Sequence, residues 1–467
     1  MSQEPRITRR GLLSTGAGLA LGALAAEPAI AAAAARHRRA HGQGHGGGHA
    51  HRGAWPLPAH DLAATRAGDR LKGAAVRWRA SFPGGVPASA AIDGGVVFAA
   101  SAAGAVAALN LSDGHERWRR ELGTAEYGSG ADRRALGFFA GVALDGRRVL
   151  VASDRAYALD ARSGRTLWQS VPLRTPTSDD YHWGLPAVAG GLVLIGSGSG
   201  AELPTARGRL STYRLRDGRL LWSTATVPEG ANGGGIIGPP SVDERLGLVY
   251  VATGSPYGAV PGINPGTCSL IALRLRDGGV VWEDQVHAAD RRGFDFNSAP
   301  VIAGRLLIAT AKDGIYAWDR LARRRLWHVQ LTDPVPGGAP TAGPTTGPEG
   351  GPIAVDLTRE TAYVLSNDGA SGGCVAAALR LRDGRVRWRS ELPGPTFAAP
   401  ALAGGRTLCV AGADGTLRLL DARNGALAGQ ADLGEPSAAA PVLGDGRLVV
   451  GTGAQPFVPG ASLVCVG

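Results

Sequence analysis

A sequence pattern that ends in tryptophan recurs along the chain, and it restricts the fold more than any other feature. One copy reads Ala-Leu-Asp-Ala-Arg-Ser-Gly-Arg-Thr-Leu-Trp and ends at Trp168. Each copy predicts a strand, a tight Asp-Gly or Asn-Gly type of turn and a second strand, which is a β-hairpin. A degenerate copy has Gly429 in place of the tryptophan, and Val76-Arg77-Trp78 opens the series. The other copies end at Trp118, Trp222, Trp282, Trp327 and Trp388.

Short apolar runs precede these hairpins, for example Val96–Ser101 and Leu192–Gly196, and each follows a turn that contains proline. Four strands per repeat, at a spacing of 40 to 61 residues, are typical of the blades of a β-propeller. The 72 glycines and 30 prolines among the 467 residues also argue against a helical fold, because neither residue belongs inside helices.

The eight tryptophan-type positions predict an all-β, eight-bladed propeller as a single domain over residues 54–467. The strand that ends at Trp78 is expected to complete the last blade, which closes the ring and removes its open edge. A seven-bladed ring is the alternative if the copy at Gly429 forms no blade.

The N-terminal residues resemble an export signal. Arg9-Arg10 precedes Gly11-Leu12-Leu13 and a run of small apolar residues, which is typical of the twin-arginine (Tat) route. We therefore expect a signal peptide over residues 1–36 and an extracellular, cell-wall or periplasmic protein. An uncleaved anchor is the alternative, although Glu27-Pro28 interrupts the run, and no membrane span is expected in the mature chain.

Residues 37–53 contain five of the ten histidines and many glycines, which predicts a disordered linker, with weak metal binding as the alternative. The formal net charge of +10 comes almost entirely from arginines spread along the chain, so no nucleic-acid partner is expected. The cysteines show no CxxC spacing; they either form disulfides after export or act as small buried residues. They are Cys268, Cys374, Cys409 and Cys465.

The tandem Ala-Leu-Asp-x-x-x-Gly-x-x-x-Trp blades resemble the propellers of pyrroloquinoline quinone (PQQ) dehydrogenases. The segment from Trp55 to Arg66 looks like the entry segment of their polyvinyl-alcohol-dehydrogenase-like branch. The resemblance covers nearly all of the chain after the linker and implies PQQ and Ca²⁺ in the central funnel of the ring. A noncatalytic outer-membrane assembly scaffold shares the blade motif, so the motif alone does not define an activity.

Three segments resemble the family's site. Ser199-Gly200-Ala201-Glu202 is similar to the family's Ser-Gly-Ala-Glu, which implies Glu202 as a calcium ligand and Ser199 beside the cofactor. Asp290–Phe296 resembles Asp-x-Trp-Asp-Phe and implies Asp295 as catalytic base and metal ligand. Lys312 matches the cation that contacts the quinone, and Arg134 matches a contact to a cofactor carboxylate. As alternatives, Glu202 is a loop residue on the rim, Asp295 is a turn or capping residue, and Arg134 is a surface residue.

Three departures from the family pattern concern the same site. Ser255 stands where the family has an asparagine that ligates calcium, so a hydroxyl is expected as the metal ligand there. Ile237 stands where the family has the tryptophan on which PQQ stacks, so an apolar contact with the cofactor is expected in place of the aromatic one. The chain also has no adjacent pair of cysteines.

Two classes of function follow. One is an exported PQQ- and Ca²⁺-dependent dehydrogenase of a small or polymeric alcohol, passing electrons to an external cytochrome or quinone. The other is a noncatalytic propeller that binds a protein or a polymer.

Overall fold

The chain divides into two compact units, Met1–Gln43 and Gly44–Gly467, and the fold below is that of the second. The computed structural model describes residues 53–128, 133–173, 180–198, 206–257, 264–288, 294, 296, 298–332, 353–368, 371–454 and 457–467. The expected signal peptide and linker lie outside the described residues, apart from Gly53.

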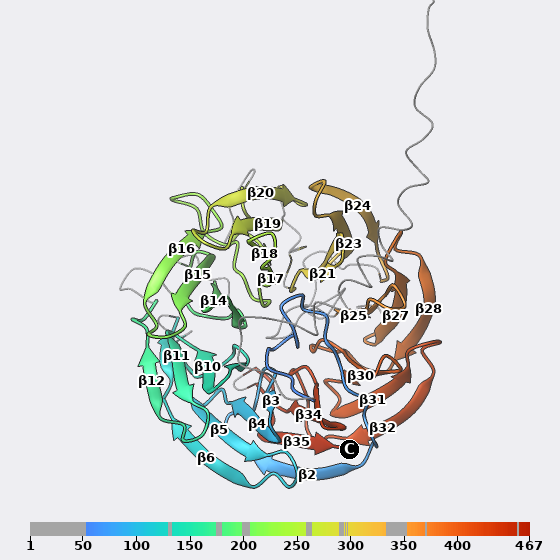
Figure 1. Ribbon diagram of the computed structural model, residues 1–467. Helices are drawn as coiled ribbons and strands as arrows, with labels where there is room; N and C mark the ends of the chain where they lie inside the picture. Colours follow the sequence, from blue (N-terminus) through green and yellow to red (C-terminus); the bar gives the residue numbers. More distant parts are fainter. Residues whose placement is uncertain are drawn as a thin grey trace, which may run out of the picture. The chain divides into compact units, whose positions relative to one another are not determined.

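The described residues of this unit form eight blades, each with four antiparallel strands, and the prediction of an all-β, eight-bladed propeller is confirmed (Figure 1). From inner to outer strand, blade 1 contains β3 (Ala91–Asp93), β4 (Val96–Ala100), β5 (Ala105–Asn110) and β6 (Glu116–Glu121), and blade 2 contains β9 (Ala143–Asp145), β10 (Arg148–Ala152), β11 (Ala156–Asp160) and β12 (Thr166–Gln169). Blade 3 contains β13 (Ala187–Ala189), β14 (Leu192–Ser197), β15 (Arg209–Arg214) and β16 (Leu220–Ala225), and blade 4 contains β17 (Ser241–Asp243), β18 (Leu248–Ala252), β19 (Ser269–Arg274) and β20 (Val280–Gln285).

Blades 5 to 8 follow the same order. Blade 5 contains β21 (Val301–Ala303), β22 (Leu306–Ala311), β23 (Gly314–Asp319) and β24 (Arg324–Val329), and blade 6 contains β25 (Ile353–Asp356), β26 (Thr361–Asn367), β27 (Cys374–Arg380) and β28 (Val386–Leu392). Blade 7 contains β29 (Ala401–Ala403), β30 (Thr407–Ala411), β31 (Thr416–Asp421) and β32 (Leu427–Asp432), and blade 8 contains β33 (Val442–Gly444), β34 (Arg447–Gly451), β35 (Ser462–Val466) and β2 (Val76–Ser81). Outside this scheme, β7 (Ala125–Tyr127) pairs with β8 (Arg134–Leu136), and β1 (Ala67–Gly68) lies parallel to β29.

The repeat motif holds neighbouring blades together. Trp118 lies on the outer strand β6, and its Nε1 donates to Ala161 O in the next blade at 2.9 Å. Gly164 of that blade has a φ of +68°, and a Cβ there would lie 2.6 Å from the Trp118 ring. The glycine is therefore required both for the turn and for the close approach of the indole.

Six blade interfaces carry this indole hydrogen bond, and two differ. At one of them Trp282 Nε1 is buried with no partner among the described residues, and the next turn has Arg323, with φ +56°, in place of the glycine. At the other, Gly429 replaces the tryptophan. The donors that do bond are Trp78, Trp118, Trp168, Trp222, Trp327 and Trp388.

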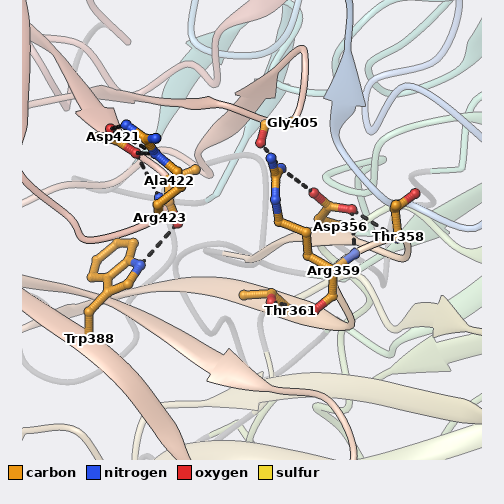
Figure 2. Close-up of polar contacts among 9 residues, drawn as sticks. All are labelled: Asp356, Thr358, Arg359, Thr361, Trp388, Gly405, Asp421, Ala422 and Arg423. Atoms are coloured by element: carbon orange, nitrogen blue, oxygen red, sulfur yellow. Dashed lines mark hydrogen bonds and ion pairs between the residues drawn. The ribbon is translucent and has the colours of Figure 1, made fainter.

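Figure 2 shows the interface of blades 6 and 7. Trp388 Nε1 donates to Ala422 O at 3.0 Å. On the inner hairpin turn of blade 6, Arg359 Nη1 lies 2.9 Å from Asp356 Oδ2 and also donates to Gly405 O of blade 7. The hydrogen bonds of Trp388 to Ala422 O and of Arg359 to Gly405 O each join a side chain of blade 6 to the backbone of blade 7. They therefore restrain the relative position of the two sheets.

The ring closes as the sequence predicts. Strand β2 pairs antiparallel with β35, and Trp78 lies opposite Cys465; the blue and red ribbons run side by side in Figure 1. Trp78 Nε1 then donates to Leu111 O of blade 1 at 3.0 Å. One sheet thus contains strands from both ends of the propeller sequence.

Residues 55–68, here called the central segment, lie across the inner strands of the ring (Figure 1). Backbone bonds join this segment to the inner strands of blades 1, 2, 4, 5, 6 and 7, the last including β1. The pairs are Trp55–Ile92, Pro56–Leu144, Leu62–Val242, Ala63–Ile302, Thr65–Val355 and Arg66–Leu402. One short stretch of chain therefore bonds to most of the blades.

Candidate functional site

The candidate residues that the structure describes belong to connections at one face of the ring. In an antiparallel blade, the turn between the second and third strands and the connection to the next blade emerge at the same end. Lys312 lies in the β22–β23 turn, Ser255 follows β18, and Ile237 precedes β17. Glu202, with Ser199, belongs to the β14–β15 connection and Asp295 to the β20–β21 connection; these three lie outside the described residues.

Backbone hydrogen bonds join the connections of blades 3 and 4. Ile236 N donates to Ser197 O at 3.1 Å, and Gly234 N donates to Ser255 O at 3.0 Å. Gly254 N donates in turn to Gly235 O at 2.8 Å. The stretch that leads to Ile237 therefore lies between the start of the segment containing Ser199 and the residues around Ser255.

A second set of contacts continues from blade 4 to blade 5. Phe296, which directly follows Asp295, donates from its N to Thr253 O at 3.3 Å and forms an isolated antiparallel bridge with Ala311. Ala311 directly precedes Lys312. The described residues that border Asp295 and Lys312 are thus neighbours, and both adjoin the connection that carries Ser255.

A polar group surrounds Asp313, beside the half-buried Lys312. Tyr316 OH donates to Asp313 Oδ2 at 2.7 Å, and His287 Nε2 lies 3.0 Å from the same oxygen. Burial would raise the pKa of Asp313, but the contacts with His287 and Tyr316 outweigh it and leave the pKa below its usual value. Asp313 is therefore a buried carboxylate that stays ionised at neutral pH.

An aromatic group on the same face includes residues that no sequence motif indicated. In each of five blades, the residue four positions before the inner strand belongs to the same apolar cluster. Tyr127 and Tyr181 belong to this cluster too. Because the only region shared by so many blades is the axis of the ring, this cluster lies around the axis. We call the five residues the strand-head arc: Phe139, Trp183, Ile237, Phe397 and Ala438.

Trp183 lies within this aromatic group. Its ring centroid is 5.2 Å from that of Phe139, 5.4 Å from Tyr181 and 5.6 Å from Tyr127. Its side chain is buried, yet Nε1 has no hydrogen-bond partner among the described residues. The arc belongs to blades 2, 3, 4, 7 and 8, whereas Lys312, Asp313 and Tyr316 belong to blade 5, so the aromatic and the polar groups come from different blades.

Arg134 lies apart from the polar side. It is exposed on β8, opposite Tyr127. With Arg133 it lines a pocket of about 460 Å³ whose other lining residues include Ala102 and Ala103. A surface position, the alternative reading of Arg134, agrees with this exposure.

The described part of the chain contains no group of three or more histidine, cysteine or acidic side chains suited to hold a metal. Both expected calcium carboxylates, Glu202 and Asp295, lie outside that part. The four cysteines are buried, and they form no disulfide with one another. None of the described residues forms a helix long and apolar enough to cross a membrane.

The repeats, the closed ring and the loops gathered at one face define a propeller of the PQQ-repeat class. A family model described as outer membrane protein assembly factor BamB matches residues 128–343 and 311–463, so the chain belongs to this family of PQQ-repeat propellers.

Relatives of two kinds share this sequence similarity. A polyvinylalcohol dehydrogenase of Pseudomonas sp is 28% identical over 251 residues, which cover 47% of this chain and 37% of that protein. BamB of Salmonella typhimurium is 26% identical over 291 residues, covering 51% of this chain and 67% of the relative. The match therefore spans little more than a third of the dehydrogenase.

A solved structure supports the same fold. Quinohemoprotein alcohol dehydrogenase from Comamonas testosteroni has a TM-score of 0.72 and 18% identity, with 94% of this chain and 83% of that chain covered. At this identity the likeness shows the propeller fold alone.

Proposed function

We propose that the protein is a quinoprotein alcohol dehydrogenase that uses PQQ and Ca²⁺ and passes electrons to an external cytochrome or quinone. The observation that carries this proposal is the series of backbone contacts from Ser197 to Ala311. These contacts join the described borders of the segments that contain Glu202, Ser255, Asp295 and Lys312. The similarity to polyvinylalcohol dehydrogenases supports an alcohol as the substrate.

The described residues suit a polar, planar group. Buried polar atoms without a partner in the described structure occur in blade 3 and in blade 5: Trp183 Nε1, Thr310 Oγ1 and Asp313 Oδ1. A buried donor or acceptor left unpaired costs about 1–3 kcal/mol, so a bound group with oxygen and N–H functions relieves that cost. The apolar residues of the strand-head arc exclude water from one side of such a group.

The roles of the chain's residues follow from their chemistry. Bound PQQ would supply the acceptor for the hydride of the alcohol carbon. Lys312 would stabilise negative charge on the quinone oxygens, and Asp295 would take the hydroxyl proton. Glu202, Asp295 and the Ser255 hydroxyl would supply hard oxygen ligands to Ca²⁺.

Titration of the purified protein with PQQ, with Ca²⁺ present or chelated, tests this proposal. We expect a bound-quinone absorbance that requires Ca²⁺. Lys312→Ala should weaken PQQ binding about tenfold or more, because a charged hydrogen bond is lost. Asp295→Asn should bind PQQ but oxidise alcohols at least about a hundredfold more slowly, because the base is absent.

Lys72→Ala is the matched control for Lys312→Ala, because Lys72 is an exposed lysine and its loss should leave PQQ affinity within about twofold. Absence of any Ca²⁺-dependent PQQ binding by the unaltered protein would contradict the proposal.

A second candidate function is a noncatalytic scaffold that binds a protein or a polymer. Ile237 and Ser255, which replace an aromatic and an amide residue of the PQQ site, favour it, as does the similarity to BamB. For a scaffold we expect no PQQ binding, together with binding of a partner that survives Lys312→Ala and Asp295→Asn.

We also propose that residues 1–36 direct Tat export and that residues 37–53 form a linker to the domain of residues 54–467. The Arg9-Arg10 pair supports this proposal, because the Tat receptor recognises paired arginines rather than positive charge alone.

A further inference from the structure

Trp183 and Ile237 occupy equivalent positions in neighbouring blades. Each lies four residues before an inner strand, β13 or β17, and each is followed by glycine. A Cβ on Gly184 would lie 2.8 Å from Ile236 O, so the two strand heads are in direct contact. An aromatic side chain is therefore present one blade away from the position where the family pattern would have one.

The Trp183 indole differs from most tryptophans of the propeller in its hydrogen bonding. Six outer-strand indoles donate to a carbonyl of the next blade. Trp183 is only 5% exposed, and its N–H has no acceptor among the described residues. Buried donors are nearly always paired, so this N–H is available for a ligand oxygen.

The surroundings hold the Trp183 ring in place. The rings of Phe139, Tyr181 and Tyr127 pack around it at centroid separations of 5.2 to 5.6 Å. Tyr181 is itself restrained, because its hydroxyl donates to Gly137 O. A side chain fixed in this way loses little conformational entropy when a ligand binds against it.

We propose that Trp183, rather than Ile237, provides the aromatic contact for the bound group, and that its N–H donates to an oxygen of a fused-ring, acidic quinone. The inference rests on the proposed function and assigns one wall of the cofactor site. Phe139 and Phe397, on the same strand-head arc, complete an apolar wall. The polar residues around Lys312 then contribute from blade 5.

The test is an equilibrium titration with PQQ at saturating Ca²⁺, followed by tryptophan fluorescence and by quinone absorbance. Trp183→Phe keeps an aromatic ring and removes the N–H, so we expect affinity to fall about fivefold to tenfold. Trp183→Leu removes the aromatic ring as well, and we expect a loss of about tenfold to a hundredfold. Ile237→Trp should not improve the affinity of either Trp183 variant.

Trp388→Phe is the matched control, because Trp388 lies on an outer strand and bonds to Ala422; its PQQ affinity should stay within twofold. Thermal unfolding and circular dichroism establish that each variant folds, and Trp183→Phe decides the matter if Trp183→Leu does not fold.

Wild-type affinity in Trp183→Phe, or a tenfold gain from Ile237→Trp, would overturn the inference while leaving the proposed function standing. If the unaltered protein binds no PQQ, both are wrong. The two failures are therefore distinguishable.

Discussion

Single tryptophan hydrogen bonds distinguish otherwise similar blade interfaces. Trp388 and Trp282 occupy the same position of the repeat and are both half-buried, but only Trp388 donates to a carbonyl, that of Ala422. Trp282 Nε1 is buried and unpaired within the described structure. A comparison of Trp388 with Trp282 therefore separates the contribution of the indole hydrogen bond to stability from that of the buried ring.

Trp388→Phe should destabilise the propeller by about 1–2 kcal/mol more than Trp282→Phe. Both changes remove a similar apolar area, but Trp388→Phe also leaves the Ala422 carbonyl without its donor. Chemical denaturation of the two variants and the unaltered protein measures the difference. Equal losses would mean that the indole hydrogen bond contributes nothing to the interface.

His182 makes stability depend on pH. It is fully buried, and burial lowers its pKa to about 4. The unfolded chain binds a proton near the ordinary pKa of about 6.5, whereas the folded chain resists it. Neutral His182 thus makes its full contribution to the free energy of unfolding above about pH 6.5. This contribution, up to about 3 kcal/mol, is lost as the pH falls towards 4.

His182→Gln should flatten the fall in unfolding free energy between pH 6.5 and 4. Its amide can still bond to Tyr213 OH, which lies 3.2 Å from His182 Nε2. Denaturation curves across this range measure the slope. His115→Gln is the control, because His115 is exposed, and an identical slope in both variants would refute the role of His182.

The sequence indicated only some of the residues at the candidate site. Lys312, Ser255 and Ile237 could be assigned to connections because the tryptophan repeat counts out the strands between them. Trp183 could not, because its place relative to an inner strand appears only when the start of β13 is known. Its nearest sequence signal is an aromatic residue shortly before Leu185-Pro186, a pattern too short to stand out.

At the scale of elements, the sequence predicted the hairpins and the closing strand better than the central segment. The hairpins follow from the turn glycines and the recurring tryptophan, and β2 follows from the missing outer strand of the last blade. The central segment bonds through backbone atoms to inner strands such as β3 and β29. Backbone bonding leaves no pattern of side-chain types, so only the structure reveals its path.

Removal of residues 54–80 should destabilise the whole ring, because it deletes both the central segment and β2. The last sheet would lose its outer strand, and six inner strands would lose backbone partners. We expect a lower and broader thermal transition, recorded by circular dichroism. A cooperative transition at an unchanged midpoint would contradict the closed-ring account of stability.

At the scale of the whole molecule, the proposed export signal can be tested with charge held constant. Arg9→Lys together with Arg10→Lys keeps both positive charges but removes the pair that the Tat receptor recognises. We expect the double variant to accumulate in the cytoplasm, measured by cell fractionation. Normal export of the double variant would indicate another route.

Closure by β2 and β35 has a consequence for the order in which the chain is made. Arg77 of β2 donates to Gly467 O, 390 positions later in the sequence. A ribosome adding about 5–20 residues per second needs roughly 20 to 80 s to synthesise that interval. Throughout that time β2 has no partner, and the growing blades form an arc with an open edge. The nascent chain must therefore be kept from pairing with other chains until its last strand emerges.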